Sequence, residues 1–175
     1  HELMVNYSHF EKLRINCRII EIYRSPIDTV YSWYKRGWGE RFGKDQRAFT
    51  MLLKDKKDIY PWYNYSNYSK YKRFNKVEKC ALNVLTLTKL SVSKLKKIRN
   101  RRNKILIIKF EDFVENPISV IKKFSIFLNK KYSKFIHKKI KEAKCPRRLS
   151  AFKKNKKKLF LKKRINKKLF NDLLS

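Results

Sequence analysis

The segment RIIEIYRSPIDTVYSWYKRG, residues 18–37, is the part of the sequence that decides the fold. It opens with a short run rich in β-branched and aromatic residues, which predicts a strand. Ser25 is a favourable helix cap, Pro26 suits the first helical position, and Asp28 completes an S-x-x-D box. Gly37 is suited to end the helix. The segment therefore predicts a strand, a tight turn and a helix.

Two polar residues of this segment have the spacing of an anion site. In an open α/β sheet, ligands bind beyond the carboxyl ends of the strands, where the amides that open the next helix favour negative charge. Arg24 stands at that strand end, and Ser32 follows eight residues later on the helix face of Asp28. We expect the Ser32 hydroxyl and the Arg24 guanidinium to share one phosphate.

A second block, KILIIKFEDFVENP at residues 104–117, contains another apolar strand followed by the pattern E-D-x-x-x-x-P. A helix is expected after it, ending near Asn129. Together with R-x-P-x-x-x-x-x-S after the first strand, this block resembles the sulfotransferases that use 3′-phosphoadenosine 5′-phosphosulfate (PAPS). The resemblance covers roughly residues 1–148.

The resemblance implies an α/β protein, namely a partial P-loop-like three-layer sulfotransferase fold with a short parallel sheet flanked by helices. Residues 1–150 would form the core, and residues 151–175 a basic amphipathic carboxyl-terminal helix. The implied function is transfer of a sulfuryl group from PAPS to an acceptor hydroxyl or amine, without a metal. The sequence does not identify the acceptor.

The family normally carries a phosphosulfate-binding loop on an earlier strand and helix. The chain has only three glycines and no glycine-rich stretch of that kind, and it begins with His1 instead of Met. We therefore expect an amino-terminally truncated chain that lacks this loop. Such a chain should be inactive alone, because removing even one positioned charge donor from a transfer site costs on the order of 10² to 10³ in rate.

The resemblance also assigns nucleotide-binding residues. Phe110 occupies the place where related enzymes often carry a tyrosine against adenine. The sequence CPRR places Arg147 and Arg148 where the family's loop closes over the adenine and the 3′-phosphate. The R-K-G element of the cytosolic enzymes is not evident, and FKKN at residues 152–155 resembles it only weakly.

The acceptor base is expected near the start of the chain. His1 lies 23 residues before Arg24, close to where many cytosolic sulfotransferases place the histidine that deprotonates the acceptor. An imidazole near neutral pH can take this proton. Glu2 is the alternative base, because some branches of the family use glutamate.

The segment from Tyr60 to Phe74 contains five tyrosines, a tryptophan and a phenylalanine within fifteen residues. Such density is typical of packing under a loop, of an acceptor-site wall or of a stacking platform for single-stranded nucleic acid. A long amphipathic helix is expected from Lys76 to Arg99. Residues 153–168 carry ten basic residues and no acidic one. This pattern predicts a basic helix that either packs on the domain or binds an anionic membrane surface.

The composition permits one domain with a core, since the 175 residues are 42% hydrophobic and 14% aromatic. The net charge of +33 raises a rival interpretation, a basic nucleic-acid-binding module. Because 34 of the 47 basic residues are lysines, we favour a compositional background and expect no specific nucleic-acid partner. A nucleotide kinase relative is a second rival. The odd number of cysteines favours reduced thiols and a cytoplasmic location.

Overall fold

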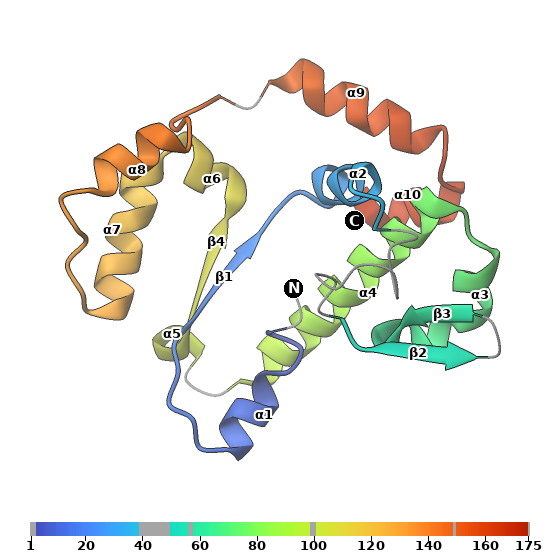
Figure 1. Ribbon diagram of the computed structural model, residues 1–175, viewed down its shortest axis with the longest axis horizontal. Coiled ribbons are helices and arrows are strands. Elements are labelled where there is room, and N and C mark those ends of the chain that lie inside the picture. Colours follow the sequence, from blue (N-terminus) through green and yellow to red (C-terminus); the bar gives the residue numbers. More distant parts are fainter. Residues whose placement is uncertain (1–2, 39–49, 56–57, 99–100, 149, 175) are drawn as a thin grey trace.

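The computed structural model describes residues 3–38, 50–55, 58–98, 101–148 and 150–174. Two strands, β1 (Ile19–Tyr23) and β4 (Ile105–Lys109), form a parallel sheet in which Ile19 pairs with Ile105 and Tyr23 with Lys109. Figure 1 shows helices α7 (Pro117–Leu128) and α8 (Ile136–Glu142) on one side of this sheet and α4 (Lys76–Lys97) on the other. The predicted α/β class with a short parallel sheet flanked by helices is confirmed.

The main core lies outside the sheet, where four helices meet. It is built from α2 (Pro26–Lys35), α4, α9 (Ala151–Lys162) and α10 (Lys167–Leu174). Val30, Cys80 and Leu161 are fully buried there. Helix α4 begins with a capping box, in which Asn75 accepts from the Val77 and Glu78 amides while Glu78 accepts from the Asn75 amide. The expected long helix is therefore present and supplies one wall of the core.

Short elements complete the fold. They are α1 (Tyr7–Lys12), the 3-10 helix η1 (Trp62–Asn67), α3 (Tyr68–Arg73), α5 (Arg101–Lys104) and α6 (Phe110–Glu115). Met4 and Tyr7 pack with Ile19 and Ile105 at the beginning of the parallel strands. This contact closes the amino end of the sheet and leaves its carboxyl end toward α2 and α9 (Figure 1).

The aromatic segment forms part of an antiparallel hairpin and the helices after it. Strands β2 (Leu52–Asp55) and β3 (Asp58–Pro61) pair with each other, a feature that the sequence did not predict. Tyr60, Tyr63 and Tyr71 are buried, whereas Tyr65 is 72% exposed. The packing interpretation therefore holds for the three buried tyrosines.

The carboxyl-terminal segment differs from the single helix that we expected. It forms α9 and α10, because the chain turns between Lys163 and Asn166 and brings the second helix back against α4. Leu161, Leu169, Phe170 and Leu173 are all buried in the main core. A boundary at residue 150 remains a prediction.

Candidate functional site

The parallel register places the residues that follow β1 and β4 side by side. Tyr23 pairs with Lys109, so that Arg24 and Phe110 are the first residues beyond adjacent strand ends. The guanidinium carbon of Arg24 lies 4.8 Å from the centre of the Phe110 ring. This distance is that of a cation–π contact, which holds the guanidinium beside the ring. The sheet thus presents a cation at its carboxyl edge.

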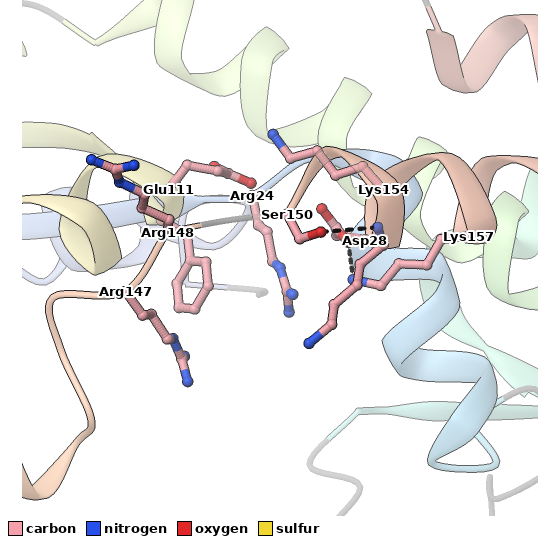
Figure 2. A pocket seen from close by; sticks show the side chains of 10 residues that line it. Arg24, Asp28, Glu111, Arg147, Arg148, Ser150, Lys154 and Lys157 are labelled. Carbon is pink, nitrogen blue, oxygen red and sulfur yellow. Dashed lines mark hydrogen bonds and ion pairs between the residues drawn. The ribbon is translucent and has the colours of Figure 1, made fainter.

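A cavity of about 220 Å³ opens beside Arg24 (Figure 2). Its walls come from the strand ends, from the segment after α8 and from the first turns of α9. The lining residues are Arg24, Asp28, Phe110, Glu111, Arg147, Arg148, Ser150, Lys153, Lys154 and Lys157. Six of these ten side chains are cationic, which makes the cavity suited to an anion.

The side chain of Arg24 has an unused donor. Its Nε atom is buried and makes no hydrogen bond within the described part of the chain. A buried donor without a partner costs on the order of 1 to 3 kcal/mol. An anion in the cavity would satisfy this group by a charge-assisted hydrogen bond.

The two carboxylates of the cavity are both engaged. Asp28, only 5% exposed, forms an ion pair with Lys157 of α9. Glu111 Oε1 accepts a hydrogen bond of 3.1 Å from the backbone amide of Ser25. This contact ties the first turn of α6, directly after β4, to the start of α2.

The expected S-x-x-D box is not formed, because Ser25 makes no side-chain capping bond and Asp28 faces Lys157 instead. The Thr29 hydroxyl donates to the Ser25 carbonyl at 3.0 Å. Glu111 and Thr29 therefore bond to Ser25 where the helix begins. Pro26 at the first helical position and Gly37 after the helix, with φ 73°, agree with prediction.

The segment after α8 approaches the cavity from the side of α6. The Arg147 amide donates to the Val114 carbonyl at 3.1 Å, which fixes the backbone next to Arg147 and Arg148. Both arginine side chains are exposed, and Figure 2 shows them across the cavity from Lys154 and Lys157. Ser150 caps α9 by accepting from the Lys153 amide at 3.4 Å. The lysines of α9 that line the cavity therefore follow directly after a capped helix start.

Four of the predicted site residues, Arg24, Phe110, Arg147 and Arg148, line this one cavity. Ser32 is half-buried on α2 and is not among the lining residues of the cavity in the described chain. His1 and Glu2 lie outside the described residues. The roles assigned to all seven residues stay predictions.

The sequence analysis missed the contribution of α9. Ser150, Lys153, Lys154 and Lys157 line the cavity, and Asp28 lines it as the partner of Lys157. The lysine-rich composition of residues 153–168 was noted, but nothing local distinguishes Lys157 from its neighbours. The weak similarity of residues 152–155 to the family's R-K-G element was the available signal.

A search against known protein families matches residues 5–172 to the sulfotransferase domain family. The match covers nearly the whole chain, which therefore belongs to this family of sulfuryl-transferring enzymes. No curated protein and no solved structure gives a significant match.

The described residues contain no group of three or more His, Cys, Asp or Glu side chains that could hold a metal ion. No helix among them is long and apolar enough to cross a membrane.

Proposed function

We propose that the cavity at the carboxyl edge of the β1/β4 sheet binds the 3′-phosphoadenosine part of PAPS, with Arg24 on the 3′-phosphate. The observation that carries this proposal is the buried Nε of Arg24, which has no partner within the described part of the chain, on a side chain that lines a cavity with six cations. A 3′-phosphate has the charge and acceptor oxygens that such a donor requires.

Each wall of the cavity has a role in this proposal. Arg24, held over the Phe110 ring, binds the phosphate, and Phe110 also offers an aromatic surface near the adenine. Arg147 and Arg148 supply cations from the opposite wall. Ser32 lies on α2 outside the lining of the cavity, and its hydroxyl is proposed as a weaker, additional donor to the phosphate. The positive amino end of α9, capped by Ser150, adds Lys153 and Lys154.

PAPS supplies the sulfuryl group, which passes to an acceptor hydroxyl or amine. The residues described here would hold the nucleotide and exclude water from its phosphate; they perform no proton transfer in this proposal. His1 or Glu2 would take the acceptor proton. In a chain with transfer activity, His1→Ala and Glu2→Gln should each leave nucleotide affinity unchanged, and the one that lowers turnover by about 10² to 10⁴ identifies the base. Full activity in both variants would exclude both residues.

We also propose that the protein is cytoplasmic and that its basic carboxyl-terminal segment contacts an anionic membrane surface. Cys17, Cys80 and Cys145 are free thiols, which supports a cytoplasmic location. Phe152 and Leu159 are 77% and 58% exposed on the lysine-rich α9, which supports contact with an anionic membrane surface. Sedimentation with anionic vesicles would test this contact, and absence of binding at low salt would exclude it.

Calorimetry with 3′-phosphoadenosine 5′-phosphate tests the assignment of Arg24. Arg24→Ala should weaken binding by about 2 to 4 kcal/mol, and Ser32→Ala by less, because the arginine contact is charge-assisted. Arg18 is the matched control, since it lies at the other end of β1 and donates to the Phe127 carbonyl at 2.6 Å. Arg18→Ala should bind like the parent. Parent-like binding by both Arg24→Ala and Ser32→Ala would overturn the assignment.

A further inference from the structure

The wall of the cavity beside Arg24 contains a buried carboxylate. Asp28 lines the cavity on α2, and its side chain is only 7% exposed. A carboxylate in this position repels a phosphate ligand. Its partner is Lys157, which lies 129 residues later in the chain on α9 and is itself 25% exposed.

Lys157 also lines the cavity, so the side chain that pairs with Asp28 also borders the space for the ligand. A lysine has three donors but one charge, which two anions must share. We propose that Asp28 limits the affinity of the cavity for its anion by holding Lys157, and that Lys157 binds the nucleotide phosphate. This inference rests on the proposed function, and Asp28 acts in it as a positioning residue.

The attachment of α9 does not depend on this ion pair alone. Leu161 is fully buried in the main core. The Phe160 ring lies 5.3 Å from the ring of Tyr31 and 5.4 Å from that of Tyr34, centre to centre. Because α9 keeps this apolar contact with α2, changing the charge of Asp28 or Lys157 should leave the helix in place.

A purely structural ion pair would behave differently from a shared cation. If the pair only joined α2 to α9, removing either partner would lower stability and change anion affinity in the same direction. If Asp28 and the ligand compete for Lys157, the two single variants change affinity in opposite directions. Opposite signs therefore exclude a purely structural pair. Direct repulsion of the ligand by Asp28 is distinguished by the double variant, because such repulsion would act equally with and without Lys157.

The test titrates four proteins with 3′-phosphoadenosine 5′-phosphate and, separately, with inorganic phosphate, after thermal unfolding has shown that each is folded. Asp28→Asn should bind about 3- to 10-fold more tightly than the parent, and Lys157→Met at least about 10-fold more weakly. Lys158→Met is the control, because Lys158 is exposed and is not among the lining residues; it should bind within about twofold of the parent. In the double variant, which leaves no buried unpaired charge, Asp28→Asn should raise affinity over Lys157→Met by less than it raises affinity in the parent.

Each outcome decides the proposal. Opposite signs for the single variants, together with a smaller gain from Asp28→Asn in the Lys157→Met background, support it. An equal gain in both backgrounds would overturn it, because Asp28 would then act by direct repulsion alone. If Lys157→Met alone fails to fold, a double variant that binds more weakly than Asp28→Asn supports it. Weaker or unchanged binding by Asp28→Asn would overturn it while leaving the proposed function intact. Opposite signs with inorganic phosphate alone, without nucleotide binding, would support the shared cation and overturn the proposed function. Absence of binding of either anion to any variant would overturn both.

Discussion

Two basic helices of this protein, α8 and α9, differ in how their cations are held. Helix α8 has no buried residue, and its Lys139 forms an exposed ion pair with Glu142 one turn away. Helix α9 buries Leu161 in the main core and joins α2 through Lys157 and Asp28. Both helices are rich in lysine, yet the lysines that line the cavity belong to α9.

The comparison indicates that charge density alone does not single out the lysines of the proposed site. An exposed lysine is hydrated and mobile, and its attraction for a ligand is screened by salt. A cation that a buried contact holds beside a cavity is less mobile and less hydrated, so salt screens it less. If the cavity binds an anion as proposed, anchoring decides which of the 47 basic residues take part.

The largest effect should come from removing the apolar anchor of α9. Leu161→Ala should lower the free energy of unfolding by about 2 to 5 kcal/mol, because Leu161 is fully buried and the substitution leaves a cavity. It should also weaken nucleotide binding, since α9 would lose its buried contact with the main core and keep mainly its contacts with α2. Leu159, 58% exposed on the same helix, is the control, and Leu159→Ala should change stability by less than about 0.5 kcal/mol. Equal chemical-denaturation midpoints for the two variants would contradict the anchoring role of Leu161.

A matched pair of double variants compares the charges themselves. On α9, Lys153→Ala with Lys154→Ala should weaken binding of 3′-phosphoadenosine 5′-phosphate by about 1 to 2 kcal/mol, because both lysines line the cavity. On α8, Lys138→Ala with Lys141→Ala removes the same charge and should cost less than about 0.5 kcal/mol. Calorimetry at about 0.15 M salt measures both. Equal losses would mean that net charge, and not the cavity, governs binding.

The smallest effect concerns Glu21, a carboxylate that forms no ion pair with the other described residues, whereas Asp28 pairs with Lys157. Glu21 of β1 lines an apolar cavity of about 390 Å³ between the sheet and α4, and burial raises its pKa above the usual value of 4.5. The folded protein then binds more protons than the unfolded chain above pH 4.5, so this group lowers stability as the pH rises through its folded pKa. At pH 7 Glu21→Gln should therefore be more stable than the parent by less than about 1 kcal/mol, since water screens the half-buried group.

The advantage of Glu21→Gln should vanish below pH 4.5, where Glu21 is protonated in both states. Glu142→Gln on α8 provides the comparison, because Glu142 is exposed and forms only a surface ion pair. Thermal unfolding between pH 4 and 8 measures both variants. A destabilised Glu21→Gln at pH 7 would show that the carboxylate has a favourable partner.

The sequence predicted those parts of the fold that depend on neighbouring residues. The strand at residues 19–23, Pro26 at the start of α2 and the turn at Gly37 follow from local propensity and were correct. The β2/β3 hairpin was missed because its strands contain Lys54, Asp55 and Asp58, and lysine and aspartate have low strand propensity. Its stability comes from pairing and from the buried Tyr60, which no local pattern shows.

The residues of the candidate site that directly follow the strands could be predicted from the sequence. The residues that α9 contributes could not. Arg24 and Phe110 are found by their positions after two apolar strands. The partner of Asp28 lies 129 residues away, and the choice of Lys157 depends on how α9 packs on α2. The expected capping role of Asp28 was wrong for the same reason, because a tertiary ion pair replaced a local bond.

The account's central claim, that the Arg24 cavity recognises a 3′-phosphate, is tested most directly by comparing two nucleotides. Calorimetric titration of the parent chain should show at least about 10-fold tighter binding of 3′-phosphoadenosine 5′-phosphate than of adenosine 5′-phosphate, which lacks that group. Arg24→Ala should lose this preference, because the buried Nε would no longer meet the additional phosphate. Equal affinity of the parent for the two nucleotides, or no binding of either, would contradict the claim.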